Sequence, residues 1–276
     1  MGALLALGAA ISFGVSDVAG AVASRRSPAL TVAIGMQFAG FPVLLAGLWW
    51  LSGTPSVQAL LLGALAGSVG NIGLVLYLRS MAVGPIGVIS PISAVVGAGV
   101  PVTWGVLVAG DPLTAVQVGG IVAGLAAVVL VAWSPGASLR AYGSRGPIVA
   151  FVAGLFFGFF FIALDATPAD SGLWPLLGAR VAGSLSLIAF FLWRGTRPRH
   201  GMAVGLIVLS GTTDMLANVL FLLATRSGLL SLASLLASLY PVVALLIARQ
   251  LLHERLRPIQ ALGVAVALAA TLALVV

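Results

Sequence analysis

Long apolar runs separated by short polar turns constrain the fold of this chain more than any other feature of its sequence. Hydrophobic residues fill 61% of the 276 positions and charged residues only 7%, whereas a soluble domain is about one quarter charged. Because roughly 20 apolar residues carry one helix across a bilayer, the runs leave room for about ten such helices and for no soluble domain. We therefore expect an all-α integral membrane protein.

The turns divide the chain into two groups of five expected helices. The first repeat spans residues 1–133, the linker 134–146 is rich in Ser, Gly and Arg, and the second repeat spans residues 147–276. The expected helices cover residues 3–22, 28–51, 57–78, 85–109, 113–133, 147–164, 173–193, 202–224, 228–252 and 256–276.

Both groups carry similar residues at matching places, which indicates an internal duplication. At a shift of 143 positions the matched pairs are Gln37 with Arg180, Gly40 with Gly183, Trp50 with Trp193, Asp111 with Glu254 and Gln117 with Gln260. At a shift of 147 positions they are Asn71 with Asn218 and Arg79 with Arg226. Since each group has an odd number of helices, the groups have opposite orientations. The sequence thus predicts an inverted repeat around a central cavity, with its site near the midplane of the membrane.

The basic residues, all thirteen of them Arg, are distributed unevenly over the turns. Eleven lie in turns on one side, namely Arg25, Arg26, Arg79, Arg140, Arg145, Arg194, Arg197, Arg199, Arg249, Arg255 and Arg257. Arg226 lies in a turn on the other side, together with Asp111, Asp165 and Asp170. Because cytoplasmic turns are enriched in basic residues, we expect a multi-pass protein of the inner (plasma) membrane with both termini outside the cytoplasm.

The first apolar run has two interpretations, a cleaved signal peptide or a first transmembrane helix. Ala21-Val22-Ala23 resembles a cleavage site. However, the run begins without a positive side chain, Asp17 interrupts it, and it has a counterpart in the second repeat. We expect the segment to be retained. The chain contains no Cys, which excludes disulfides and thiol chemistry.

Each repeat ends with a Pro inside an apolar helix, an acidic residue in a short turn, and then Gln and Gly. The residues are Tyr240-Pro241-Val242-Val243, His253-Glu254-Arg255-Leu256 and Gln260 to Gly263, with a weaker copy in Val100-Pro101-Val102 and Asp111-Pro112-Leu113. These segments resemble the EamA-type drug/metabolite transporters, which usually have Glu where this chain has Asp111. Phe13-Gly14 and Phe157-Gly158 resemble the aromatic–glycine pair in the first helix of each family repeat.

This resemblance implies ten helices, no cofactor, and a central cavity lined by the first four helices of each repeat. It also implies export of amino acids or other small metabolites, and the chain looks most similar to the aromatic amino-acid exporters. One alternative is the same fold with a nucleobase, a sugar derivative or a cationic drug as cargo. Another is a membrane-embedded lipid enzyme, for which the six acidic residues are too scattered. A passive scaffold or receptor would leave Arg180 and Asp214 unexplained.

Polar residues inside the expected helices are few, and an ionisable one costs on the order of 2.5–3.5 kcal/mol by insertion scales. The candidate substrate-binding residues are Asp17, Gln37, Asn71, Tyr77, Arg180, Asp214, Asn218 and Tyr240. Arg180 either forms a structural ion pair with Asp214 or binds a substrate carboxylate. Asp214 is a candidate for binding protons or a substrate amine. Asp17 is a second candidate proton carrier, or else it is solvated near the interface.

The remaining candidates are amides, phenols and Phe residues. Asn71 and Asn218 suit hydrogen bonds between helices or contacts with a substrate, and the buried phenols of Tyr77 and Tyr240 each need a polar partner. Six Phe occupy the helix expected at 147–164, of which one or two are predicted to face the cavity; they are Phe151, Phe156, Phe157, Phe159, Phe160 and Phe161.

Three prolines inside expected helices, Pro91, Pro101 and Pro241, are candidate gating kinks or simple bends. His200 and His253 fall in Arg-rich turns, so no metal site is expected. The chain shows no carboxylate pair, Ser–His arrangement or phosphate-binding loop. We therefore expect a transporter without catalytic residues or cofactors, whose partners are a small-molecule substrate, protons and the lipid bilayer, with no nucleic acid. A monomer is expected, since the two repeats supply their own pseudo-symmetric counterpart.

Overall fold

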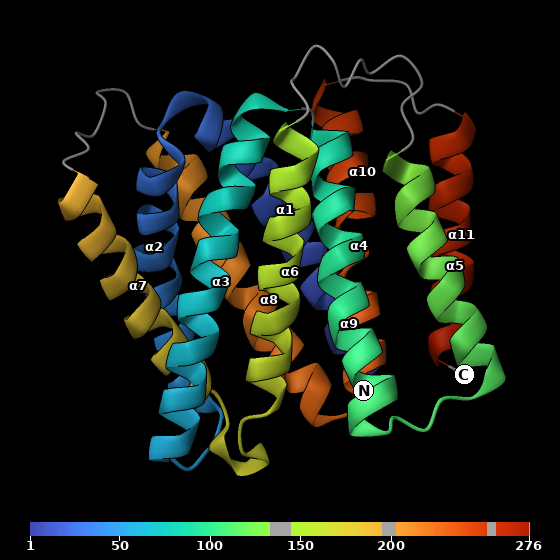
Figure 1. The fold of residues 1–276 in the computed structure, drawn as a ribbon, viewed down its shortest axis with the longest axis horizontal. Coiled ribbons are helices and arrows are strands. Elements are labelled where there is room, and N and C mark those ends of the chain that lie inside the picture. The colour runs from blue at the N-terminus through green and yellow to red at the C-terminus, as the bar shows by residue number, and fades with distance from the viewer. Residues whose placement is uncertain (85, 133–144, 195–202, 253–257, 276) are drawn as a thin grey trace.

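The computed structural model describes residues 1–84, 86–132, 145–194, 203–252 and 258–275, and within these ranges every regular element is a helix. Figure 1 shows the helices standing side by side in one bundle. They are α1 (Gly2–Arg26), α2 (Ala29–Trp50), α3 (Val57–Val83), α4 (Ile86–Trp104), α5 (Ala115–Ala132), α6 (Arg145–Asp165), α7 (Trp174–Arg194), α8 (Val204–Arg226), α9 (Leu230–Ala237), α10 (Tyr240–Leu252) and α11 (Pro258–Val275).

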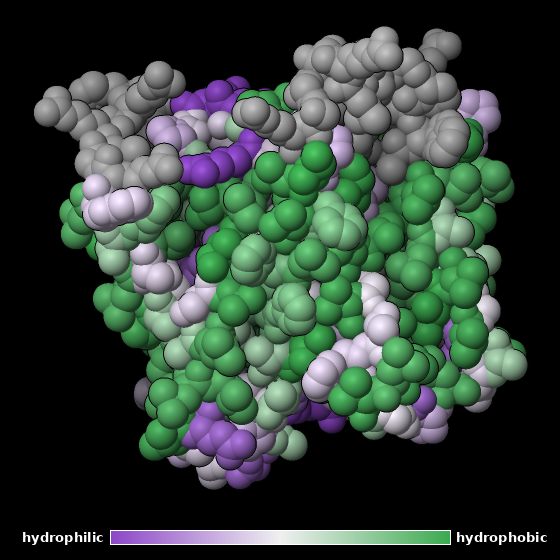
Figure 2. Space-filling view, in the orientation of Figure 1, coloured by the Kyte–Doolittle hydropathy of each residue, from purple (hydrophilic) through white to green (hydrophobic). Residues whose placement is uncertain are grey.

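The helices account for ten membrane crossings, as the sequence predicts. Eight segments of the described chain are long and apolar enough to span a bilayer, and one of them, Leu230–Ile247, combines α9 with most of α10. The shorter α5 and α11 supply the other two crossings. Apolar side chains cover the middle of the molecular surface in Figure 2, while polar residues gather toward its two ends. The fold is therefore that of an all-α integral membrane protein.

The ninth expected helix is interrupted, which corrects the prediction of one continuous helix from 228 to 252. α9 ends at Ala237, two turn residues follow, and α10 begins at Tyr240. Pro241 explains the break because a proline lacks the amide donor and its ring clashes with the carbonyl four residues earlier, here that of Ala237. The chain crosses the break through a tight bond from the Val242 amide to the Leu239 carbonyl, 2.9 Å long.

Pro91 and Pro101 have a weaker effect on α4. The helix continues through both of them and then passes into a single π-helical segment, Gly105–Ala109. Gly110 ends this segment with a φ of 72°, in the left-handed region that glycine adopts without strain. A proline thus interrupts the fourth span of the second repeat, whereas the fourth span of the first repeat only changes its winding.

The acidic residue in the first turn of the repeated motif has a structural partner. Asp111, between α4 and α5, accepts hydrogen bonds through Oδ2 from the amide nitrogen and the hydroxyl of Ser231, at 3.2 and 2.6 Å. Ser231 is in the first turn of α9, where free amide groups and the helix dipole favour a negative charge. This contact joins the end of the first repeat to the broken span. Glu254, its counterpart, lies outside the described residues.

Helix packing follows an approximate two-fold relation between the repeats. The packing of α1 on α8 corresponds to that of α6 on α3, and α2 on α8 corresponds to α7 on α3. Two pairs, α2 with α7 and α5 with α11, each combine a helix with its own counterpart. The relation therefore places its axis between α2 and α7 at one end of the bundle and between α5 and α11 at the other.

Contacts between turns show that the first helices of the two repeats run in opposite directions. The α2–α3 turn meets the α6–α7 turn, where the Thr54 amide donates to the Asp170 carbonyl at 2.9 Å and the Trp174 indole donates to the Gly53 carbonyl at 3.2 Å. Both turns follow an even number of crossings, so they lie on the side where α1 begins. We call this the chain-end side, because the N and C labels in Figure 1 also lie there.

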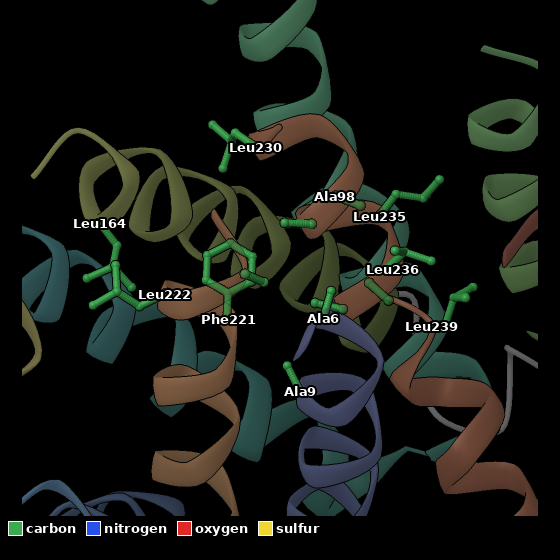
Figure 3. Packing of buried hydrophobic residues seen from close by; sticks show 14 of the residues in the cluster. Ala6, Ala9, Ala98, Leu164, Phe221, Leu222, Leu230, Leu235, Leu236 and Leu239 are labelled. Carbon is green, nitrogen blue, oxygen red and sulfur yellow. The ribbon is translucent and has the colours of Figure 1, made fainter. Parts of the chain in front are cut away.

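Buried apolar residues fill the chain-end half of the bundle. Figure 3 shows Ala6 and Ala9 of α1 facing residues from the end of α8 and from α9, with Phe221 near the centre. Phe221 and Leu235 are completely buried. Because dispersion contacts replace the hydrophobic effect within lipid, this dense cluster is what holds α1, α8 and α9 together on that side.

Candidate functional site

A cavity of ≈ 140 Å³ lies between the two repeats, and all eight candidate substrate-binding residues lie on its wall. Residues of α1 to α4, α6 to α8, the α9–α10 turn and α10 line it, whereas α5 and α11 contribute none. The cavity is smaller than the roughly 300–1,000 Å³ of pockets that hold drug-sized ligands. In this conformation it therefore suits a small metabolite.

The guanidinium of Arg180 is the centre of the polar wall, where it joins three helices. From α7 it donates through Nη1 to Gln37 Oε1 on α2, and through Nη2 to Asp214 Oδ2 on α8 at 3.3 Å. Nη2 also lies 2.7 Å from Met215 Sδ. Only 6% of the Arg180 side chain is exposed, against 19% for Asp214. The structural ion pair expected from the sequence is present, and its carboxylate is the half that faces the cavity more openly.

Two glycines leave the space through which these side chains reach each other. A Cβ atom on Gly40 of α2 would lie 2.7 Å from Arg180 Nη2 and 2.8 Å from its Cζ, too close for either atom to stay. Gly183 of α7 is the counterpart, and a Cβ there would collide with the amide of Asn71 and approach that of Gln37 to 2.9 Å. The Arg180 side chain therefore packs against α2 at Gly40, and the Gln37 and Asn71 side chains pack against α7 at Gly183.

The repeat-related asparagines do not bond each other; each is anchored within its own helix. Asn71 Nδ2 donates to the Gly67 carbonyl and Asn218 Nδ2 to the Asp214 carbonyl, both at 2.8 Å and both four residues back. Asn71 Oδ1 also accepts from Gln37 Nε2 at 2.5 Å. The expectation of bonds between helices therefore holds for Asn71 only.

Asp17 forms a second polar group on the cavity wall. Its Oδ2 accepts hydrogen bonds from the phenol of Tyr77 and the hydroxyl of Ser90, both at 2.6 Å. Tyr240 reaches the carbonyl of Ser90 with a long contact of 3.5 Å. Asp17 is thus fixed by α3 and α4 inside the bundle, and the alternative of a carboxylate solvated at the membrane interface is wrong.

Aromatic rings cover one wall of the same cavity. Phe13 lies 6.1 Å from Tyr240 and 6.3 Å from Phe161, measured between ring centroids, and Tyr77 meets Phe157 edge-on at 5.6 Å. Phe157, Phe160 and Phe161 line the cavity, one more than the largest number expected from α6. Phe151 and Phe159 are about half exposed on the outer surface of α6, where lipid would cover them.

Several contributors to this site were not among the sequence candidates. Ser90 and Met215 contact candidate side chains, Phe13 extends the aromatic wall, and Gly40 makes room for Arg180. Gly40 and Phe13 had a usable signal, because Gly40 matches Gly183 at the shift that matches Gln37 with Arg180, and Phe13 belongs to the aromatic–glycine pair of the first helix. The three prolines considered as gating kinks or simple bends, Pro91, Pro101 and Pro241, are not among the residues that line the cavity.

Metal ligands do not cluster within the described ranges, where no group of three or more His, Cys, Asp or Glu residues could hold an ion. His200 and His253, considered from the sequence, lie outside those ranges. The described cavity wall offers one guanidinium, two carboxylates, amides, hydroxyls and aromatic rings. This chemistry suits reversible binding of a small polar molecule.

Ten crossings around a small cavity, whose mainly apolar wall carries a few polar groups, define a multi-pass membrane protein with a site for a small molecule. Comparison with known families gives the particular group: the model of the EamA-like transporter family matches residues 1–133 and again residues 144–276. The chain belongs to this family, whose members transport small molecules across membranes.

Comparison with curated proteins and with solved structures supports the fold but identifies no cargo. No curated protein matches the chain in sequence. One solved structure, described only as a crystal structure of a protein, aligns with a TM-score of 0.71 and 16% identity over 97% of this chain and 94% of that chain. At this identity the likeness concerns the fold alone.

Proposed function

We propose that this transporter exports small zwitterionic metabolites, in the first place amino acids with apolar or aromatic side chains, across the inner membrane. The observation that carries the proposal is the pairing of charges of both signs with an aromatic wall in one small cavity. Arg180 offers a donor for a carboxylate, Asp214 and Asp17 offer acceptors for an ammonium group, and Phe13 and Phe161 offer an apolar surface.

Arg180 serves a carboxylate in this proposal without giving up its ion pair. A guanidinium has five N–H donors, and its contacts here are Gln37, Asp214 and Met215. The 3.3 Å separation from Asp214 is long for a charge-assisted hydrogen bond, which is typically about 2.7–2.9 Å. A substrate carboxylate can therefore share Nη2 with Asp214 at modest cost.

A second candidate cargo is a cationic amine. The wall contains two carboxylates and one guanidinium, so one carboxylate exceeds the number of fixed cations when all three are ionised. A cargo with an amine and no carboxylate would balance that excess at Asp17 and leave the Arg180–Asp214 pair intact.

Transport is proposed to follow alternating access, with the repeats rocking about the axis where Gln37 meets Arg180. The apolar cluster around Phe221 packs the chain-end side tightly, so opening toward that side requires α1, α8 and α9 to separate. The break before Pro241 gives α9 a joint at which such a movement can occur. We also propose that the chain-end side faces outward, in line with the arginine count. A C-terminal reporter that is active only outside the cytoplasm should therefore work, and activity of a cytoplasm-only reporter would contradict this orientation.

Counterflow in proteoliposomes tests the cargo. Vesicles preloaded with phenylalanine should accumulate labelled phenylalanine, while phenylalanine amide, which lacks the carboxylate, and N-acetylphenylalanine, which lacks the ammonium, should compete poorly. Stronger competition by the amide than by phenylalanine would select the cationic-amine candidate. Competition by nucleobases or sugars alone would overturn both.

A further inference from the structure

Two residues on the cavity wall, Ser93 and Asn218, have a buried side-chain oxygen without a hydrogen bond from the described residues, and only that of Asn218 is an amide oxygen, which can accept but not donate. Asn218 is 8% exposed, and its side-chain oxygen Oδ1 is buried without a hydrogen bond from any residue that the structure describes. A buried amide oxygen without a donor loses the hydrogen bonds that it would make with water. The vacancy therefore weakens the protein unless another molecule supplies the donor.

Reversing the amide does not remove the vacancy. Asn218 Nδ2 donates to the Asp214 carbonyl at 2.8 Å, so a flipped amide would turn its oxygen toward that carbonyl and leave the nitrogen unpaired. Hydroxyl groups escape this difficulty, as Ser68 shows by donating to the Ala64 carbonyl while its lone pairs stay free. An amide oxygen can only accept, so Asn218 needs a donor from outside its own helix.

The first repeat shows what the missing donor would be. Asn71 makes the same bond to a carbonyl four residues back, and its Oδ1 accepts a hydrogen bond from Gln37. Gln37 is the counterpart of Arg180 in the first repeat. By the repeat relation, Asn218 would receive its donor from Arg180. That guanidinium instead turns to Gln37 and Asp214. The second repeat therefore keeps the acceptor, Asn218 Oδ1, but its expected donor, Arg180, bonds to other residues.

We infer that the Asn218 side-chain oxygen accepts a hydrogen bond from the cargo. This deepens the proposed function and rests on it: in an amino acid whose carboxylate lies at Arg180, the nearest donor is the ammonium group on the same carbon. Asn218 is one helical turn from Asp214, so both acceptors lie on the same face of α8. Asn218 lines the cavity, and the broad terminal torsion of Asn lets its amide rotate when a cargo supplies the donor.

Thermal stability, measured without any cargo, tests whether Asn218 Oδ1 lacks a hydrogen-bond donor, and Asn71 is the matched control. Asn218→Leu removes an unpaired acceptor, so its melting temperature should equal or exceed that of the wild type. Asn71→Leu strands the Gln37 amide and should lower the melting temperature by roughly 5 °C. Equal losses in the two variants would mean that Asn218 Oδ1 is already satisfied, and would overturn the inference.

Binding measurements then test the donor, with phenylalanine and its N-trimethyl betaine as probes. The betaine keeps both charges but has no N–H group, so the wild type should bind phenylalanine about ten- to hundredfold more tightly than the betaine. Asn218→Leu should lose most of this preference, and Asn71→Leu should keep it. An unchanged preference in Asn218→Leu would overturn the inference while leaving the proposed function intact. If the wild type binds no amino acid, the proposed function and the ammonium assignment fail together, and the stability comparison alone then decides whether the acceptor is vacant.

Discussion

The α2–α3 pair and the α7–α8 pair occupy equivalent places in the two repeats but differ in chemistry. In the first, Gln37 and Asn71 form a neutral amide pair beside Gly183. In the second, Arg180 passes Gly40 to meet Asp214. The repeat shift that matches Asn71 with Asn218 also matches Gly67 with Asp214, so a carboxylate stands where the first repeat has no side chain.

This difference separates the scaffold from the candidate site. The geometry is shared: each asparagine donates to the carbonyl four residues back, and each glycine makes room for a long polar side chain from the other repeat. Among these cavity residues, the guanidinium, its carboxylate partner and the unpaired amide oxygen of Asn218 all belong to the α7–α8 pair. We therefore expect changes in the α2–α3 pair to affect mainly stability, and changes in the α7–α8 pair to affect transport.

The largest effect on stability and transport is expected when Arg180 is replaced by Gln, the residue at the matching position of the first repeat. Arg180→Gln leaves the Asp214 carboxylate without its cation, and breaking a buried pair in this way costs about 3–5 kcal/mol. The double variant Arg180→Gln with Asp214→Asn removes the stranded charge and should recover most of the lost stability. It should still transport phenylalanine about a hundredfold more slowly, because the carboxylate anchor is gone.

Melting temperature and counterflow measured on both variants separate the two roles of Arg180. Normal counterflow by a well-folded double variant would show that the guanidinium is structural and would remove it from the substrate site. The single variant Arg180→Lys, which keeps the charge and loses the bidentate fork, is the control for charge alone.

The next largest effect is expected from replacing Gly40 or Gly183, which lie against the polar side chains, with Ala. Gly40→Ala places a methyl group against the guanidinium, and Gly183→Ala places one against the amide pair, so each should destabilise the protein by about 1–3 kcal/mol. Per folded molecule, Gly40→Ala should also raise the KM for phenylalanine, whereas Gly183→Ala should leave it nearly unchanged. Equal effects on KM would contradict the division between scaffold and site.

The smallest structural effect is expected at Asp17, which belongs to neither pair. Asp17→Asn keeps an oxygen that accepts from Tyr77 and Ser90, so the melting temperature should change by only a few degrees. If Asp17 carries the coupling proton, a pH gradient should no longer accelerate transport by this variant, although counterflow without a gradient continues. Tyr240 and Asp214 face the same cavity and stay intact. Unchanged acceleration by the gradient would exclude Asp17 as the proton site, and Asp214→Asn is then the next variant to measure.

The sequence by itself determined the class of fold and the ionisable and amide side chains of the cavity wall. Long apolar runs can satisfy their backbone groups in lipid only as helices, and ionisable residues inside such runs turn away from lipid. The first rule was enough to predict ten crossings, and polar side chains inside the apolar runs supplied the eight candidates that the structure places around one cavity. The repeat shift also matches Gln37 with Arg180, two side chains that are in contact in the structure.

Only the tertiary structure decided which of these residues meet. Arg180 bonds Gln37 across 143 positions because the repeat axis passes between α2 and α7, and helical spacing within one segment carries no information about that contact. The same holds for Asp17, whose partners come from two other helices. The unpaired oxygen of Asn218 is the clearest case: its sequence position matches Asn71, yet it has no donor because Arg180 turns toward Asp214, whose counterpart in the first repeat is Gly67.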